Sequence, residues 1–235
     1  MADERTAGDP AVAEAPEAEA IDAEELEEHA EIDPELLERR REALAEVRQF
    51  GDPVLKSAAS EVSAFGPELE GEAERMIALM QGALGIGLAA TQLGVMRRML
   101  VFQAGPDSAP RALVNPRVEW SSGEEWLAEE GCLSLKGIVV DVERPLHARI
   151  SARDISGEPV LLEASGLEAR VLQHEIDHLD GVLILDRTVR EQRRGALRAL
   201  RSGESFDPSM LEPPDAEVDA DAAGDGADPA RPSPE

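Results

Sequence analysis

The clearest hydrophobic pattern in this chain lies between Ser165 and Gly181. Apolar residues recur there close to the 3.6-residue period of an α-helix, at Leu167, Val171, Leu172 and Leu179. Ser165 and Glu168 have the spacing of a capping box, and Gly181 suits a helix C-terminus. The pattern therefore predicts a helix that begins at Gly166 or Leu167 and turns one side towards a core.

Stretches rich in Val, Ile and Leu, separated by turn residues, predict short strands in the rest of the chain. They lie near residues 98–103, 112–119, 124–129, 137–142, 146–154 and 159–163. Asp33-Pro34-Glu35 is a helix start, because it offers an N-cap, a proline at the first position and an acidic first turn. Helices and strands are partly segregated, which predicts an α+β fold with antiparallel sheets packed around a central helix.

The predicted central helix carries the candidate chemistry. Within Gln173-His174-Glu175-Ile176-Asp177-His178, two of the four histidines of the chain lie four residues apart. Residues at i and i+4 share a helix face, so His174 and His178 can hold one metal ion, with Glu175 placed to move a proton on its bound water. The alternative is two solvent-facing histidines on a charged helix, and the core-facing pattern around them argues against it.

A catalytic metal site of this kind needs a third protein ligand. Cys132, the only cysteine, lies in Glu130-Gly131-Cys132-Leu133-Ser134. Its thiolate would suit iron or zinc, although a lone cysteine is also common as a small buried hydrophobic residue. A third motif, Gly85-Ile86-Gly87-Leu88-Ala89-Ala90-Thr91-Gln92, follows a helical pattern instead of a strand, so we interpret it as a loop that approaches a ligand and not as a dinucleotide site.

These three motifs, in this order, resemble those of the peptide deformylase family: a G-x-G-L-A-A-x-Q loop, an E-G-C-L-S segment and a Q-H-E-x-D-H helix. The resemblance extends over roughly residues 46–190, with further matches at Gly51–Leu55, Leu113–Pro116 and Val142–Pro145. It implies a hydrolase that removes formate from the N-terminal formyl-methionine of newly made proteins. It also implies ferrous iron as the metal, with zinc or another divalent transition metal able to occupy the same site.

The resemblance implies a role for each matching residue. Cys132, His174 and His178 would bind the metal, and Glu175 would be the general acid/base. The remaining positions fall into two groups: Gln92 and the N–H of Leu133 would stabilise the oxyanion, whereas Ile86, Gly87 and Gly131 would line the substrate cleft. The chain departs from the family pattern at two positions, where Lys136 replaces a frequent proline and Val139 an arginine of some members. These departures concern peptide preference beyond methionine.

Two rival functions are weighed against this interpretation. A zinc metalloprotease would share the H-E-x-x-H motif, but such enzymes usually place the third ligand downstream, and the 57 residues after His178 hold no histidine or cysteine. An inactive metal-stabilised module on the ribosome would be expected to lack the glutamate or glutamine, yet Glu175 and Gln92 are both present. Both rivals rank below the deformylase.

Charge divides the chain into a body and two acidic ends. The total net charge is −27, of which residues 1–33 carry −12 and residues 203–235 carry −9. Residues 34–202 therefore carry only −6. We predict an acidic N-terminal extension over 1–33, a charged helix over 34–45, a catalytic domain over 46–190, a basic helix over 191–206 and a disordered acidic tail over 207–235. Segments of this composition bury too little apolar surface to offset chain entropy.

The stretch from Arg187 to Arg201 places four arginines on one helix face: Arg190, Arg194, Arg198 and Arg201. This stripe either meets phosphate groups, as ribosomal RNA would offer to an enzyme of nascent chains, or is an arginine-rich solvated face, which the acidic tail favours. The chain shows no signal peptide and no membrane-spanning apolar run. We expect a monomeric cytoplasmic enzyme that acts on N-formylmethionyl peptides and nascent chains.

Overall fold

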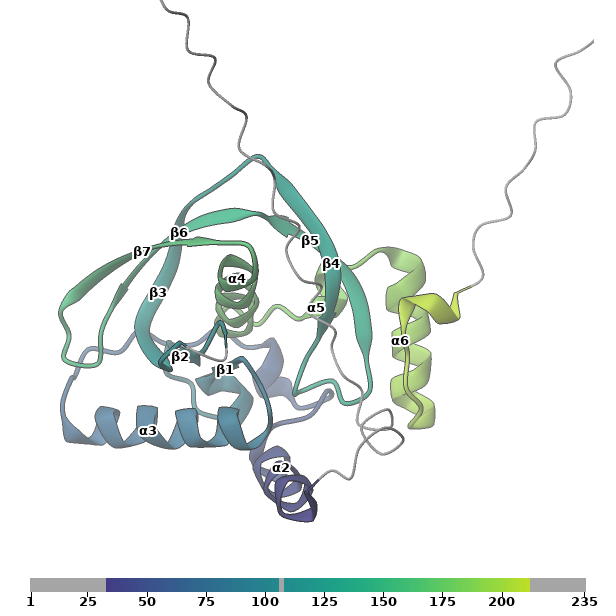
Figure 1. Ribbon diagram of the computed structural model, residues 1–235, viewed down its shortest axis with the longest axis horizontal. Coiled ribbons are helices and arrows are strands. Elements are labelled where there is room, and N and C mark those ends of the chain that lie inside the picture. Colours follow the sequence, from purple (N-terminus) through teal and green to yellow (C-terminus); the bar gives the residue numbers. More distant parts are fainter. Residues whose placement is uncertain (1–32, 106–107, 212–235) are drawn as a thin grey trace, which may run out of the picture.

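The computed structural model describes residues 33–105 and 108–211. The predicted disorder of the acidic ends therefore concerns residues that lie almost entirely outside this range. Figure 1 shows the described residues as curved sheets around one central helix, α4 (Leu167–Leu179). In the part of the chain that is described, no helix is both long and apolar enough to cross a membrane.

The sheets are antiparallel. Five strands follow the order β1-β2-β3-β6-β7, with bounds Gly87–Ala89, Met99–Phe102, Arg111–Ser121, His147–Arg153 and Pro159–Ser165. The other two, β4 (Glu125–Gly131) and β5 (Val139–Pro145), pair along their whole length from Glu125 opposite Pro145 to Gly131 opposite Val139. Figure 1 shows both sheets bending around α4, which confirms the predicted α+β class.

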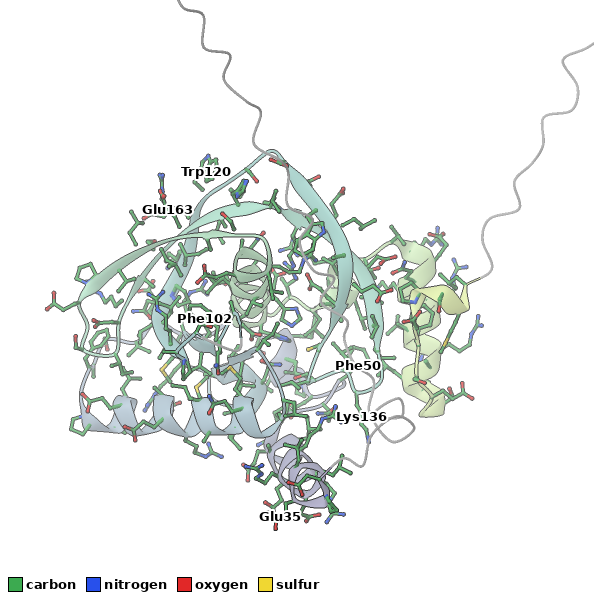
Figure 2. The ribbon with its side chains drawn as sticks, in the orientation of Figure 1. Glu35, Phe50, Phe102, Trp120, Lys136 and Glu163 are labelled. Carbon is green, nitrogen blue, oxygen red and sulfur yellow. The ribbon has the colours of Figure 1, made fainter. Side chains whose placement is uncertain are left out.

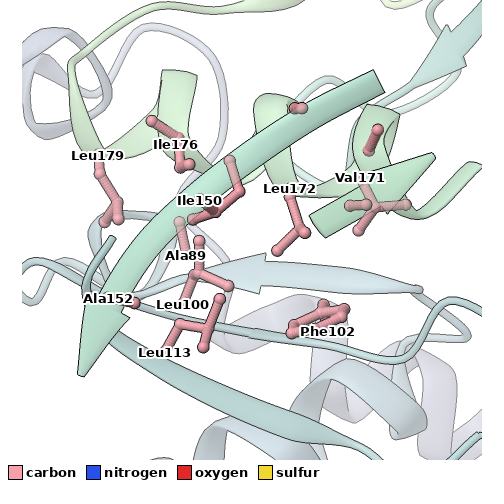
Figure 3. Packing of buried hydrophobic residues seen from close by; sticks show 13 residues of the cluster. Ala89, Leu100, Phe102, Leu113, Ile150, Ala152, Val171, Leu172, Ile176 and Leu179 are labelled. Atoms are coloured by element: carbon pink, nitrogen blue, oxygen red, sulfur yellow. The ribbon is translucent and has the colours of Figure 1, made fainter. Parts of the chain in front are cut away.

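The core lies on both sides of α4. On the side of the large sheet, Leu172 and Ile176 of the helix pack against Leu100, Leu113 and Ile150 (Figure 3). A second cluster lies under β5 and includes Leu135, Ile138 and Val140. Because α4 is covered on almost every side, most of the polar residues that it carries are buried as well, and each of these needs a partner.

The bend of the large sheet begins at β3. Its pairing with β6 changes register between Val114 and Arg117 and again between Val118 and Trp120. Asn115 has a φ of 54°, a left-handed conformation that asparagine tolerates better than most residues. Its side chain accepts the N–H of Val62 at 2.8 Å and donates to the carbonyl of the same residue at 2.9 Å. Bulges of this kind increase local twist, which lets the sheet curve.

Helices cover the outside of this framework. They are α2 (Pro34–Glu46), α3 (Pro67–Gly82), α5 (Ile184–Arg187) and α6 (Arg190–Ser202), with the short 3₁₀ turns η1 (Pro53–Lys56), η2 (Ala90–Leu93) and η3 (Pro208–Met210). The predicted start of α2 is confirmed, because the Asp33 side chain accepts the N–H of Glu35 at 2.9 Å. Figure 1 shows α6 outside the β4–β5 ribbon.

Three sequence-based expectations differ from the structure. The predicted capping box at Ser165 is wrong: Gly166 is the N-cap without a side-chain cap, and the Ser165 hydroxyl contacts Nδ1 of His147 instead. The basic helix ends at Ser202, because Gly203 takes a left-handed φ of 74°. Residues 207–211, assigned to the tail, instead form an ordered turn in which the Asp207 side chain accepts the N–H of Ser209.

Candidate metal centre

Three potential metal ligands from distant parts of the chain meet beside α4. His174 and His178 lie one turn apart on the helix, with ring centroids 4.9 Å apart. Cys132 directly follows β4, and its Sγ lies 3.2 Å from Nε2 of His178. The ligand atoms of all three residues lie within 4.8 Å of one another. The structure thus brings together the three residues that the sequence analysis selected.

A buried carboxylate fixes the ring of His174. Oε2 of Glu130 lies 2.9 Å from Nδ1 of His174, which leaves Nε2 free to face the other two ligands. Burial raises the pKa of Glu130, but hydrogen bonds from His174 and Arg144 outweigh it and hold the pKa well below 4.5. Glu130 therefore stays an anion that accepts the imidazole N–H and sets its orientation.

Arginines surround this carboxylate. Arg144 donates to Glu130 through Nε at 2.6 Å and Nη2 at 2.9 Å, and to Asp177 through Nη1 at 2.9 Å. Arg170 donates to Oε1 of Glu130 at 2.6 Å and also binds the carbonyls of Trp126 and Val142, so it ties α4 to both strands of the ribbon. Sequence reasoning missed this network, because each member read alone resembles a surface charge.

Glu175 lies beside the ligands and is almost fully buried. Burial raises the pKa of its carboxyl from 4.5 to about 7, although the charges of His174 and Arg144 act in the opposite direction. The carboxylate lies against the backbone of Gly87, where a methyl group would collide with Oε1. The glycine that was assigned to the cleft therefore has a defined role, which is to leave space for the Glu175 carboxylate.

The side chain of Gln92 is held on two sides. Its Oε1 accepts the N–H of Ala89 at 2.8 Å, and its Nε2 lies 3.2 Å from Oγ of Ser134 and 3.8 Å from Sγ of Cys132. The amide donor is thus aimed at the space next to the thiol. Ser134 is fully buried and was not selected from the sequence, although it belongs to the same E-G-C-L-S segment.

The remaining predicted residues surround this space. Within residues 33–105 and 108–211, the N–H of Leu133 has no hydrogen-bond acceptor, whereas its carbonyl accepts Nε2 of Gln49 at 3.0 Å. Ile86 is 46% exposed, and Gly131 is exposed at the end of β4. The segments that flank the ligands therefore offer three features: the free N–H of Leu133, the exposed side chain of Ile86 and the accessible backbone of Gly131.

The donor set fits a transition metal. One thiolate and two imidazoles are typical ligands of iron and zinc, and three ligands leave a position open for water or substrate. Buried Oε2 of Glu175, beside the ligands, has no hydrogen-bond partner among the described residues. Buried polar atoms are nearly always paired, so this orphan indicates that a further group binds next to Glu175.

The two imidazoles differ in proton affinity. Burial lowers the pKa of His174, yet hydrogen bonds to Cys132 and Glu130 outweigh it and raise the pKa well above 6.5. For His178, burial lowers the pKa and the positive charges of His174 and Arg144 lower it further. In the metal-free site a proton therefore binds to His174 in preference to His178. A bound cation would displace that proton.

Comparison with known proteins identifies the family. A family model described as polypeptide deformylase matches residues 44–194. The chain belongs to the polypeptide deformylase family. It is 45% identical over 162 residues to a peptide deformylase of Acidothermus cellulolyticus, covering 69% of this chain and 88% of the relative. A second relative, peptide deformylase 2 of Gloeobacter violaceus, is 44% identical over 144 residues, which cover 60% and 77% of the two chains.

Solved structures agree with this assignment. A Synechococcus elongatus peptide deformylase in complex with actinonin superimposes with a TM-score of 0.63 at 38% identity, covering 71% of this chain and 91% of that one. Peptide deformylase 1B of Arabidopsis thaliana gives a TM-score of 0.64 at 34% identity, covering 66% and 88%. The enzyme is a metal-dependent hydrolase that removes the formyl group from N-terminal formyl-methionine of newly made proteins and releases formate.

Proposed function

We propose that Cys132, His174 and His178 hold the catalytic metal, that Glu175 is the general acid/base, and that Gln92 and the N–H of Leu133 bind the oxyanion. The observation that supports this most directly is the convergence of the three ligand atoms within 4.8 Å, next to the buried Glu175. When bound, a divalent metal would acidify a water molecule and polarise the formyl carbonyl. All other steps fall to the side chains and backbone of the enzyme.

Glu175 moves the proton in this scheme. Its carboxylate accepts a proton from the attacking water and later delivers it to the leaving amine of methionine. Burial raises the pKa of Glu175 to about 7 in the metal-free protein, and a bound cation would favour the ionised carboxylate that accepts the proton. Gly87 permits the carboxylate to lie against the backbone, because any side chain at residue 87 would collide with it.

Two donors meet the negative charge that develops on the former formyl oxygen. Nε2 of Gln92 is already oriented by Ala89 and Ser134, and the N–H of Leu133 needs no rearrangement to become available. Donors that are held in place in this way stabilise a transition state without a reorganisation cost, and removal of one typically raises the barrier by about 2.7–4 kcal/mol. Ile86, Gly87 and Gly131 would line the path of the peptide.

The substrate separates this proposal from a metalloprotease. We expect formate release from formyl-Met-Ala-Ser and no cleavage of the N-acetylated or unformylated peptide. A protease that shares the H-E-x-x-H motif would cut internal peptide bonds regardless of the formyl group. Cleavage of the unformylated peptide at a comparable rate would contradict the proposed specificity.

We propose ferrous iron as the native metal, and air sensitivity tests this. A thiolate-bound ferrous site is open to oxidation, so activity of the iron-loaded enzyme is expected to fall in air and to be protected by reductant or anaerobic handling. The measurement is metal analysis of anaerobically prepared protein together with formate release from the same sample. Zinc-loaded protein is the control, since zinc has no redox chemistry. Equal and lasting activity of aerobic and anaerobic iron preparations would contradict iron as the metal.

We also propose that α6 docks on ribosomal RNA. Arg194, Arg198 and Arg201 line a surface depression of about 580 Å³ together with Leu197 and Ser202. Within the described residues, none of the three arginines forms a salt bridge with a carboxylate. Unpaired guanidinium groups on one helix face suit a phosphate backbone. The alternative remains a solvated face, and the acidic composition of residues 203–235 supports that alternative.

Ribosome co-sedimentation at low salt decides between the two. Replacing Arg194, Arg198 and Arg201 by glutamate is expected to reduce binding strongly, because each phosphate contact contributes to a salt-dependent affinity. The control is Arg149→Glu, which reverses a partly exposed charge on β6. Equal retention of the triple variant and the control would end this proposal. The monomeric state and the cytoplasmic location also stay proposals, which light scattering and cell fractionation test.

A further inference from the structure

The chain beyond α6 turns back towards the metal centre. After Gly203 the direction reverses, and residue 206 reaches the start of β5, where Ile138 and Phe206 form a parallel bridge. The N–H of Phe206 donates to the carbonyl of Gly137 at 2.8 Å, and the N–H of Val139 donates to the carbonyl of Phe206 at 2.8 Å. We call residues 203–206 the return segment.

The partner of the return segment is the end of the loop that carries Cys132. Two consecutive turns connect Cys132 to Ile138. In the first, the N–H of Leu135 donates to the carbonyl of Cys132 at 2.9 Å, and in the second, the N–H of Ile138 donates to the carbonyl of Leu135 at 3.1 Å. Between these points lie Leu133, with its free N–H, and Ser134, which holds Gln92. The return segment therefore fixes one end of the loop that supplies three groups of the proposed site.

The opposite side of the loop is held independently. The N–H of Phe50 donates to the carbonyl of Ser134 at 2.9 Å, and Gln49 donates to the carbonyl of Leu133. Figure 2 marks Phe50 and also Lys136, an exposed residue of the same loop. The loop is thus held between two supports, one from the segment before η1 and one from the return segment.

Side-chain packing strengthens the second support. Phe206 is 6% exposed and packs in one cluster with Leu135 and Ile138, against which Cys132 also lies. Its ring occupies the space that a side chain at Gly195 would need, so α6 and the return segment close on each other only because residue 195 is glycine. The family match ends at residue 194, so the return segment lies outside it.

We propose that Phe206 is a positioning residue of the metal centre, which holds the Cys132–Ile138 loop so that the thiol and the N–H of Leu133 face the metal and the substrate. Phe206 touches neither of them and acts only through the loop. The proposal rests on the assignment of Cys132 as a metal ligand. It predicts that weakening the return segment loosens metal binding before it unfolds the protein.

The test measures metal release from full-length cobalt-loaded protein by a competing chelator, together with the thiolate-to-cobalt absorption band. Phe206→Ala is expected to release cobalt about tenfold faster, within the range for loss of a residue that orients a metal ligand, and to shift the band. Phe206→Leu keeps an apolar but smaller and differently shaped side chain, and is expected to release cobalt at an intermediate rate, faster than the wild type and slower than Phe206→Ala. Met210→Ala, an exposed residue of the same C-terminal stretch, is the control and should match the wild type.

The outcomes separate three cases. An unchanged release rate and band in Phe206→Ala, with only a lower melting temperature, would overturn the positioning role. If Phe206→Ala does not fold, Phe206→Leu decides: faster release than Met210→Ala supports the proposal, and equal release overturns it. Cys132→Ser tests the underlying assignment separately. This substitution should abolish the thiolate-to-cobalt band. A band that persists in Cys132→Ser would refute Cys132 as a ligand, independently of the result for the Phe206 variants.

Discussion

Glu175→Ala is expected to lower kcat/KM for formate release from formyl-Met-Ala-Ser by about 10²–10⁴-fold, the usual contribution of general acid–base catalysis. The Glu175 carboxylate lies against Gly87, whereas Glu130, the other buried acid beside His174, is held by Arg144 and Arg170, so it is not placed to replace Glu175. Metal content should stay close to one per chain, because the three proposed ligands are untouched. Formate release and metal analysis of the same sample give both values.

Glu168→Ala provides the matched control for this change. It removes a glutamate from the first turn of the same helix, away from the ligands, and should leave kcat/KM unchanged. A Glu175→Ala enzyme that turns over at the wild-type rate would refute Glu175 as the acid/base. Loss of metal along with activity would instead mean that Glu175 supports the ligands and does not transfer the proton.

The raised pKa of Glu175 also has a consequence for stability. In the metal-free protein its folded pKa of about 7 lies above the unfolded value of 4.5, so the folded state binds the proton more tightly. This contribution to stability is fully present below pH 4.5 and is lost as the pH rises through 7. Above pH 7 the folded metal-free protein therefore holds a charged carboxylate in a buried position, which costs stability, and a bound cation would offset that cost.

The helix that carries the histidines could be predicted because its apolar residues follow a clear period. The same period places His174 and His178 on one face, so two of the three ligands follow from local sequence alone. The participation of Cys132 does not follow in this way. It depends on the antiparallel pairing of β4 with β5 and on the packing of that ribbon against α4. From the residues alone Cys132 was one candidate, with a buried hydrophobic role as the alternative, and the resemblance to a family favoured it as the ligand.

Supporting interactions were the hardest to predict, and Ser165 illustrates why. Its spacing to Glu168 satisfies a local rule, but Ser165 is the last residue of β7 and its hydroxyl meets His147 across the sheet. Similarly, Arg170 looks like a solvent-facing helix residue, although it binds three backbone carbonyls and Glu130. Phe206 was assigned to the end of the basic helix, because its pairing with Gly137 joins residues far apart in the chain and leaves no local signal. Tertiary contacts decide all three cases.

Glu130→Ala is expected to destabilise the folded protein strongly. The carboxylate receives hydrogen bonds from Arg144, Arg170 and His174, and its removal leaves two buried guanidinium groups without their main anion. Breaking a buried pair from one side typically costs about 3–5 kcal/mol, because the remaining charge stays buried and uncompensated. Urea unfolding of the metal-free protein at pH 7 measures this loss.

The chain offers a matched control in Glu163, which pairs with Arg149 on the outer face of the large sheet, where Figure 2 labels it. Glu163 is 73% exposed in its side chain, so Glu163→Ala should change the free energy of unfolding by less than about 1 kcal/mol. Equal effects of the two substitutions would contradict the structural role of the buried network.

Metal affinity and pH dependence give the same substitution two further readouts. Because Glu130 orients His174, Glu130→Ala should weaken metal binding by about 10–100-fold, measured by chelator competition on the folded variant. The folded pKa of Glu130 lies well below 4.5, so its contribution to stability is present above pH 4.5 and is lost as the pH falls further. The difference in unfolding free energy between wild type and variant should therefore be largest at about pH 5 to 6 and shrink in stronger acid. It should also shrink as the pH rises above 6.5, because Glu130 helps to raise the pKa of His174 and that contribution is lost at higher pH. A difference that grows as the pH falls below 4.5 would show that Glu130 is protonated in the folded enzyme, and the anchoring of His174 by an anion would then have to be abandoned.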